Sequence, residues 1–287
     1  MAMTACSPAR LLTNFDRLTS PGNARQVAHS VPYGSGARQS LDVWAPRRRD
    51  GQQLPVVIFF YGGGWSEGAA ADYGFAGAAY AANGFIAVVP DYRLVPSVRF
   101  PAFVEDGALA VKWVRDNIGD YGGDPDRVTI AGHSAGAYIG AMLTLDQSYL
   151  RKVGVDPKIV RAAALMSGPY DFHPFTEPRG RNAFGAWTNP AQTQPITFAR
   201  ADAPPMLLMH GTTDRVVMPY NSKRLTERLT QLGAPVTLRM YSGVNHIDTV
   251  TSLAAAFRGR TPALAESSQF LLENSRPQAQ RRRAATR

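Results

Sequence analysis

Ser134 lies between an apolar run and a helical stretch, where a serine hydroxyl could act as a nucleophile. Residues 132–136 read GHSAG, a G-x-S-x-G pattern, and residues 127–133 have the composition of a buried strand. A strand, a sharp turn and a helix N-terminus make a nucleophile elbow, and the glycines leave room for that turn. A small-residue turn without chemistry is the alternative, but the context favours a nucleophile.

A serine hydroxyl needs a base to remove its proton, and the chain has five histidines. His246 follows the last expected strand, in SGVNHID, where a loop can bring an imidazole to the carboxyl edge of a sheet. We therefore assign His246 as the base. His133 should pack beside the serine, and His210 closes an apolar run as a buried core histidine would. His29 and His173 lie before the first strand and in a long loop.

The base in turn needs a carboxylate that fixes its tautomer. Asp214 stands just past the apolar run 205–211, so the candidate triad is Ser134, Asp214 and His246 in chain order. Asp202 precedes that run and would lie at the opposite end of the sheet. Other carboxylates are weaker candidates for the acid: Asp91, Asp171 and Asp248.

Three consecutive glycines follow the apolar run 54–61. A tetrahedral intermediate carries an oxyanion that backbone N–H groups must approach closely, and missing side chains permit that approach. We assign the N–H groups of Gly63, Gly64 and Ala135 as the oxyanion hole. Without the elbow, a flexible glycine turn would be the better reading.

Residues 168–204 are rich in proline, glycine and aromatic residues and form a long break in the pattern. A segment of this length favours a small cap or lid over a site. We expect Trp65, Phe184 and Trp187 to line a substrate pocket that prefers short acyl chains. Packing in the core is an equal alternative for these aromatic side chains.

Apolar runs of strand length alternate with helical stretches, which predicts an α/β fold with a mostly parallel, doubly wound sheet and helices on both faces. The expected strands span 39–46, 54–61, 85–92, 127–133, 161–168, 205–211 and 236–243. The expected helices span 71–84, 102–122, 134–145 and 222–233. The expected domains are an N-terminal lead-in (1–37), a catalytic domain (38–275) and a basic disordered tail (276–287).

The net charge of +9 falls to +4 without the five arginines of the tail, which argues against a nucleic-acid surface. The single cysteine, Cys6, excludes an intramolecular disulfide, and we expect no metal and no cofactor. The sequence contains no run of 18 apolar residues, so it predicts no membrane-spanning helix. The default expectation is a soluble cytoplasmic protein. The alternative is an exported bacterial lipoprotein, with its signal removed and Cys6 as the lipidated residue.

The sequence resembles the α/β-hydrolase superfamily, specifically carboxylesterases and hormone-sensitive-lipase-like enzymes with an HGGG loop. The similar segments are YGGGW (61–65), DYRLVP (91–96), FPAFVEDGALAVKWV (100–114), GGDPDRVTIAGHSAGA (122–137) and HGTTDRVV (210–217). The resemblance spans about residues 38–258 and implies hydrolysis of a small-molecule carboxylic ester through an acyl-enzyme. It says nothing about oligomeric state.

Tyr61 departs from the family pattern, which has histidine at this position of the loop. We expect Tyr61 to support the loop rather than to transfer protons, and we expect Asp91 to pair with Arg93. Two alternatives for the function stay open. The GGGW loop is also similar to that of kynurenine formamidases, which hydrolyse an amide-like bond, and a binding module on an inactive hydrolase scaffold is the alternative of another class.

Overall fold

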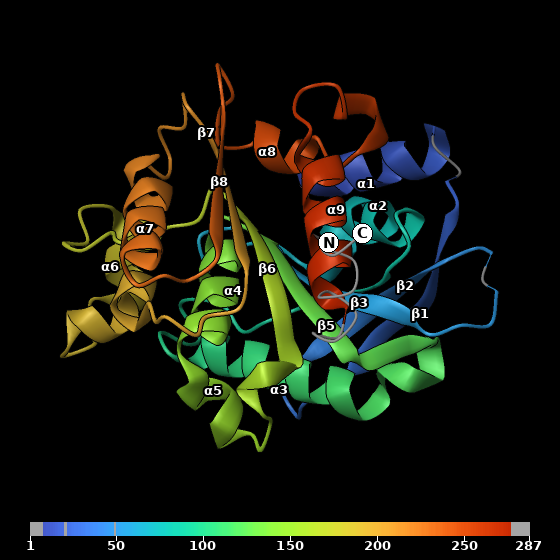
Figure 1. Cartoon of the computed structure of the whole chain (residues 1–287), viewed down its shortest axis with the longest axis horizontal. Helices are drawn as coiled ribbons and strands as arrows, with labels where there is room; N and C mark the ends of the chain where they lie inside the picture. Colours follow the sequence, from blue (N-terminus) through green and yellow to red (C-terminus); the bar gives the residue numbers. More distant parts are fainter. Residues whose placement is uncertain (1–7, 20–21, 49, 277–287) are drawn as a thin grey trace, which may run out of the picture.

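A single eight-stranded sheet forms the centre of the computed structural model, which describes residues 8–19, 22–48 and 50–276 (Figure 1). The strand order is β1-β2-β4-β3-β5-β6-β7-β8. β2 pairs antiparallel with β1 and with β4, and every later pairing is parallel. The strands are β1 Ala24–Pro32, β2 Ser40–Pro46, β3 Leu54–Phe60, β4 Ile86–Pro90, β5 Gly123–His133, β6 Val160–Met166, β7 Met206–Gly211 and β8 Val236–Tyr241.

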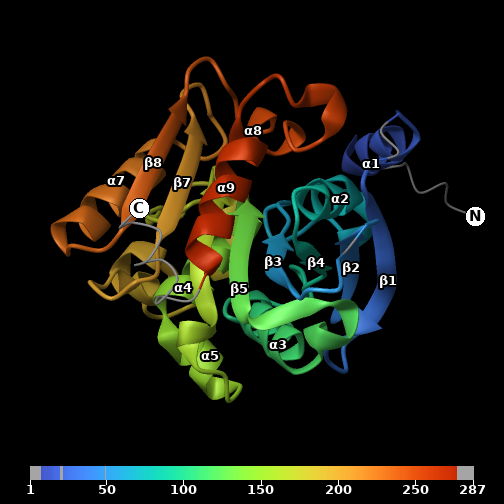
Figure 2. The same cartoon turned by 45° about the vertical axis from the view of Figure 1, so that its right-hand side comes forward.

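Helices cover both faces of the sheet (Figures 1 and 2). α2 and α9 pack on one face, and α3, α4 and α7 pack on the other. The helices are α1 Pro8–Thr19, α2 Gly74–Ala82, α3 Ala102–Asn117, α4 Ala135–Leu145, α5 Gln147–Lys152, α6 Pro178–Phe184, α7 Tyr220–Gln231, α8 Asp248–Thr251 and α9 Ala263–Ser275. This arrangement confirms the expected doubly wound α/β architecture.

Three strands of the sheet, β3, β4 and β7, are buried over almost their whole length. Every residue of β4 and of β7 is buried, and β3 is buried from its second residue onward. A strand with helices on both faces has no solvent-facing side, so continuous apolar runs suit it better than alternating ones. The carboxyl ends of these parallel strands meet at one edge of the sheet, where the site lies.

The sheet begins earlier in the chain than expected. β1 lies within the segment 1–37, which we expected only to lead into the domain, and it pairs with β2 as the edge strand. The segment 168–204 contains α6 and two short 3-10 turns, Pro190–Thr193 and Pro195–Phe198. Its role as a cap, and the domain boundaries, stay predictions. Cys6 and nearly all of the basic tail lie outside the described residues.

Two further observations hold for the described part of the chain. None of its helices is long and apolar enough to cross a bilayer. No cluster of three or more histidine, cysteine, aspartate or glutamate side chains within it is arranged to hold a metal ion.

Candidate active site

Ser134 occupies a sharp turn between β5 and α4. Its backbone angles are φ 53° and ψ −120°, a strained conformation for a residue with a side chain. A Cβ at Gly136 would lie 2.0 Å from the carbonyl oxygen of Phe60, and one at Gly132 would lie 2.7 Å from the Gly136 carbonyl oxygen. The turn therefore needs glycine at both positions, as a nucleophile elbow does.

Hydrogen bonds connect the three candidate triad residues. The Ser134 hydroxyl lies 2.9 Å from His246 Nε2, and His246 Nδ1 lies 2.8 Å from Asp214 Oδ2. A carboxylate only accepts, so Nδ1 carries the imidazole proton and Nε2 is free to accept the proton of the serine. All three side chains are buried, and their exposure rises from Asp214 (1%) through His246 (6%) to Ser134 (9%). Their catalytic roles stay predictions.

The three residues come from separate elements that end at one edge of the sheet. Ser134 follows β5, Asp214 follows β7, and His246 follows β8. β7 and β8 are neighbours, and β6 separates them from β5. The Thr213 N–H joins the loops after β7 and β8 by donating to the Val244 carbonyl oxygen at 3.1 Å, and His133 at the end of β5 bridges the gap by donating to the His246 carbonyl oxygen at 2.9 Å.

The Asp214 carboxylate is held in its charged form. Burial raises its pKa, but polar contacts with His210 and His246, together with the Val217 N–H, outweigh that effect and hold the pKa below its ordinary value. The N–H groups of Val216 and Val217 both donate to Oδ1 at 2.9 Å. A carboxylate that stays ionised can stabilise a histidine cation formed during proton transfer.

The glycine loop lies directly against the serine. A Cβ at Gly62 would lie 3.2 Å from the Ser134 Cβ, and one at Gly63 would lie 2.2 Å from the Glu67 carbonyl oxygen. Gly63 and Gly64 have positive φ angles of 131° and 57°. In the described residues, the N–H groups of Gly63, Gly64 and Ala135 have no hydrogen-bond acceptor. They are available to the oxyanion that we predicted they bind.

Tyr61 supports this loop through a buried polar network. Its hydroxyl donates to Asp91 Oδ1 at 2.7 Å and accepts from Arg38 Nη2 at 2.8 Å, while the Tyr92 hydroxyl donates to the Tyr61 carbonyl oxygen. Burial raises the pKa of Tyr61 well above 10, so the phenol stays protonated.

The expected ion pair between Asp91 and Arg93 was wrong. Arg93 pairs with the buried Asp106, at 2.8 Å, and Arg38 pairs with Asp91 at 3.2 Å. The side chain of Arg38 reaches Asp91 from before β2, a contact between segments 53 residues apart. Local sequence could not reveal it.

The alternative acids lie in ion pairs with arginines. These pairs are Asp202 with Arg200, Asp171 with Arg224, and Asp248 with Arg260. His29 pairs with Asp42, and His173 is exposed. In the described residues, the imidazole of His246 makes its hydrogen bonds to Asp214 and Ser134, and to none of these aspartates or histidines.

Two other buried histidines contact the triad: His133, which we expected beside the serine, and His210, whose contact with the acid the sequence did not indicate. His133 donates from Nε2 to the His246 carbonyl oxygen at 2.9 Å, and burial lowers the pKa of His133 to about 3. His210 Nε2 lies 3.1 Å from Asp214 Oδ2. Both positions were expected to be buried, and their flanking glycines in GHS and HGT were the available signal.

The three predicted pocket residues belong to one aromatic cluster. The Trp65 and Phe184 rings are 4.8 Å apart edge to face, and Phe100 joins Trp187 to Phe184 at 5.0 and 5.6 Å. Trp65 follows Gly64 directly, which places the cluster beside the glycine loop. Contact of these residues with substrate stays a prediction.

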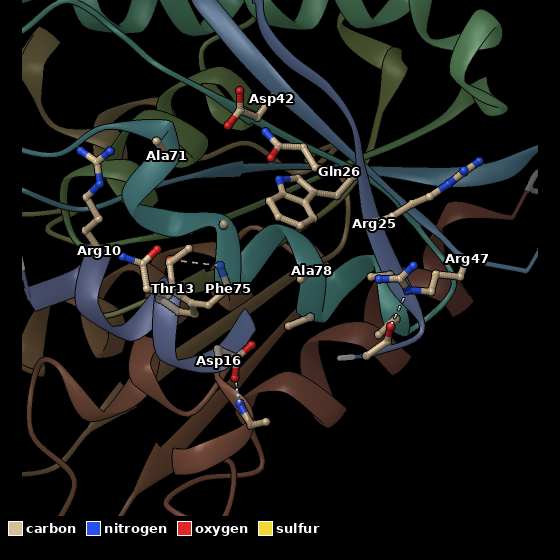
Figure 3. A pocket seen from close by; sticks show the side chains of 18 of the residues that line it. Arg10, Thr13, Asp16, Arg25, Gln26, Asp42, Arg47, Ala71, Phe75 and Ala78 are labelled. Atoms are coloured by element: carbon tan, nitrogen blue, oxygen red, sulfur yellow. Dashed lines mark hydrogen bonds between the residues drawn. The ribbon is translucent and has the colours of Figure 1, made fainter. Parts of the chain in front are cut away.

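A cavity of about 650 Å³ lies elsewhere, between α1, β1, β2 and α2 (Figure 3). Arg10 and Asp16 border it from α1, Arg25 from β1, and Phe75 and Ala78 from α2. None of the triad residues lines it. It is separate from the candidate active site.

Solved structures with the same architecture identify the fold as that of the α/β hydrolases. A truncated carbohydrate esterase from gut microbiota superposes with a TM-score of 0.71 at 22% identity, covering 88% of this chain and 96% of the other. Esterase B from Lactobacillus rhamnosis, inhibited with a tributyrin phosphonate, gives 0.76 at 18% identity, with 91% of each chain covered. The expected α/β-hydrolase fold is confirmed.

The chain belongs to the BD-FAE family, which it matches over residues 41–229. It is 32% identical to esterase LipQ of Mycobacterium tuberculosis, covering 86% of this chain and 63% of LipQ. It is 29% identical to the isoprenylcysteine alpha-carbonyl methylesterase ICME of Arabidopsis thaliana, covering 78% of this chain and 57% of ICME. The chain thus spans less than two thirds of the length of these relatives.

Proposed function

We propose that this chain is a serine esterase that hydrolyses carboxylic esters of small molecules through an acyl-enzyme. The observation that carries the proposal is the continuous line of hydrogen bonds from Ser134 through His246 to Asp214. The esterase and methylesterase names of its relatives support the same reaction class.

In the first half of the reaction, Ser134 Oγ attacks the ester carbonyl carbon while its proton passes to His246 Nε2. Asp214 stabilises the resulting imidazolium. The carbonyl oxygen becomes an oxyanion that accepts hydrogen bonds from Gly63, Gly64 and Ala135. When the tetrahedral intermediate collapses, His246 returns the proton to the departing alcohol and leaves an acyl-serine.

In the second half, a water molecule replaces the alcohol. His246 removes a proton from this water as its oxygen attacks the acyl carbon, and the second tetrahedral intermediate collapses to a carboxylic acid while His246 returns the proton to Ser134 Oγ. The reaction needs only the groups of this chain and water, so the proposal includes no metal or organic cofactor.

We also propose a preference for short acyl chains. Trp65 and Phe184 are 6% and 1% exposed, and they pack against Phe172, Phe103 and Tyr138 beside the glycine loop. Rings that fill this space leave little room for a long chain. Cleavage of C12 esters faster than C4 esters would contradict this preference.

The test is an ester panel that varies the acyl and alcohol groups separately, run beside N-formylkynurenine. Wild-type protein should hydrolyse p-nitrophenyl acetate or butyrate and take up one organophosphonate label. Ser134→Ala should abolish both while the melting temperature stays within a few degrees. Turnover of the formamide but of no ester would support the amide-hydrolase alternative, and an absence of labelling and turnover would support the binding module.

A further inference from the structure

His210 is a buried histidine beside the triad that the mechanism above does not use. It is the penultimate residue of β7 and is fully buried. Its Nδ1 lies 2.7 Å from the Ser222 hydroxyl on α7, and its Nε2 lies 2.8 Å from the Val217 carbonyl oxygen. The same Nε2 lies 3.1 Å from Asp214 Oδ2. One ring thus connects a strand end, a helix and the turn that carries the acid.

The contacts define where the ring proton lies. Nε2 faces two oxygens that can only accept, the Val217 carbonyl and the Asp214 carboxylate, so Nε2 must carry a proton. Nδ1 faces a hydroxyl, which can donate to it. The neutral ring with its proton on Nε2 therefore satisfies every contact at once.

The same ring contacts both the turn and the acid. His210 Nε2 donates to the Val217 carbonyl oxygen, and the N–H of Val217, which belongs to the preceding peptide group, donates to Asp214 Oδ1. The polar edge of the same ring also faces Oδ2, the oxygen that accepts from His246 Nδ1. The turn from Asp214 to Val217 is closed around the carboxylate by His210.

We propose that His210 is a positioning residue for catalysis, which fixes the orientation of Asp214 and limits its pull on the proton of His246. The inference rests on the proposed esterase function. It assigns a role to a residue that touches neither the substrate nor the serine and acts only through the acid.

The removal of this N–H should have two effects. The Asp214 carboxylate loses one fixed contact, so it no longer holds His246 in a single orientation and kcat falls. Its charge is also less compensated, so it attracts the His246 proton more strongly and the acid limb of the kcat/KM profile moves to higher pH. His133, whose ring lies 4.8 Å from that of His246, also faces the base, and Asp248 accepts from the Asn245 N–H in the same loop; the variant leaves both in place.

The experiment compares His210→Phe, which keeps a ring without a donor, with His210→Gln, which offers an N–H near the position of Nε2. His29→Phe is the matched control, because it makes the same change at an exposed histidine paired with Asp42. For His210→Phe we expect kcat to fall about 10- to 100-fold with KM nearly unchanged. His210→Gln should recover most of the lost kcat, and His29→Phe should match the wild type.

Wild-type turnover of p-nitrophenyl acetate tests the proposed function separately, and the ratios among variants test the role of His210. A folded His210→Phe with wild-type kcat and an unmoved acid limb would overturn the proposal, as would a folded His210→Gln no more active than His210→Phe. If His210→Phe does not fold, the nitrogen-15 shifts of the wild-type ring decide. A proton on Nε2 supports the proposal, and a proton on Nδ1 alone overturns it.

Discussion

His133 donates a hydrogen bond from Nε2 to the backbone carbonyl oxygen of His246, at 2.9 Å, and the two rings lie 4.8 Å apart. The residue before the serine thus holds the loop of the base. Nδ1 of His133 is buried and has no partner in the described residues, so the ring is neutral with its proton on Nε2.

This arrangement predicts a pH dependence of stability. Burial lowers the pKa of His133 to about 3, whereas the pKa of a histidine in the unfolded chain is about 6.5. The unfolded chain therefore binds a proton that the folded chain refuses. The contribution of His133 to stability is full above about pH 6.5 and falls as the pH drops, with a slope of up to about 1.4 kcal/mol per pH unit.

His133→Gln removes the titration and keeps an N–H donor. Denaturant unfolding between about pH 4.5 and 7 should give a shallower loss of unfolding free energy with falling pH in the variant than in the wild type. The lowered pKa of Asp214 contributes only at more acidic pH, where the carboxylate protonates. Parallel curves for the two proteins would contradict the buried neutral state of His133.

Tyr61→Phe should affect the loop more than the chemistry. The ring can stay stacked between Tyr73 and Tyr92, while Asp91 loses a hydrogen bond. We expect kcat to fall by about 10-fold or less, against roughly 10²- to 10³-fold for the loss of an oxyanion donor. The measurement is kcat across pH for p-nitrophenyl butyrate. Inactivity equal to that of Ser134→Ala, or loss of the limb near neutrality, would give Tyr61 a chemical role.

Gly136→Ala should destroy the elbow. Its Cβ would meet the Phe60 carbonyl oxygen at 2.0 Å, and neither backbone has space to move in a buried junction. We expect loss of activity and destabilisation by about 3 kcal/mol or more, measured by thermal and denaturant unfolding. Gly259→Ala is the control, since its Cβ meets nothing within 4 Å. Equal stability of the two variants would refute the close approach.

Phe184→Leu should relax the acyl-chain preference. The ring is buried against Trp65 and Tyr138, so a smaller side chain opens space beside the glycine loop. We expect the ratio of kcat/KM for C8 over C4 esters to rise about 3- to 10-fold. Phe85→Leu makes the same change at a buried ring that packs on Tyr80 instead. A similar rise in both variants would mean that general loosening, and not the pocket, sets the preference.

Seven of the eight strands could be predicted from sequence, six because their apolar runs are continuous and β2 because its residues alternate and end at Pro46. β1 could not, since this edge strand alternates irregularly between half-buried and exposed residues. α9 was also missed. Its buried face includes Ser267, Ser268 and Ser275, and Ser267 is satisfied by Tyr80 and by the Leu264 carbonyl oxygen. Hydropathy cannot identify a buried helix face that carries several serine side chains.

Some parts of the candidate site could also be predicted from sequence, and others could not. The candidate triad was predictable because its residues follow strand ends in a recognisable order, and the glycine loop because close approach demands glycine. The contacts of His210 and Arg38 were not, because they depend on which loops meet after the sheet assembles. The apolar run around His210 correctly predicted that this side chain is buried, but it carried no information about the contact with Asp214.

The placement of the candidate base ties the proposed function to an edge strand of the sheet. Ser134 follows a central strand, but His246 follows β8, which pairs only with β7 and is half-exposed along most of its length. Edge segments with few buried contacts open locally at lower free energy than the core. Opening of β8 would carry the base away from the serine while the rest of the protein stays folded. If His246 is the base, we therefore expect activity to be lost on warming before the cooperative melting of the molecule.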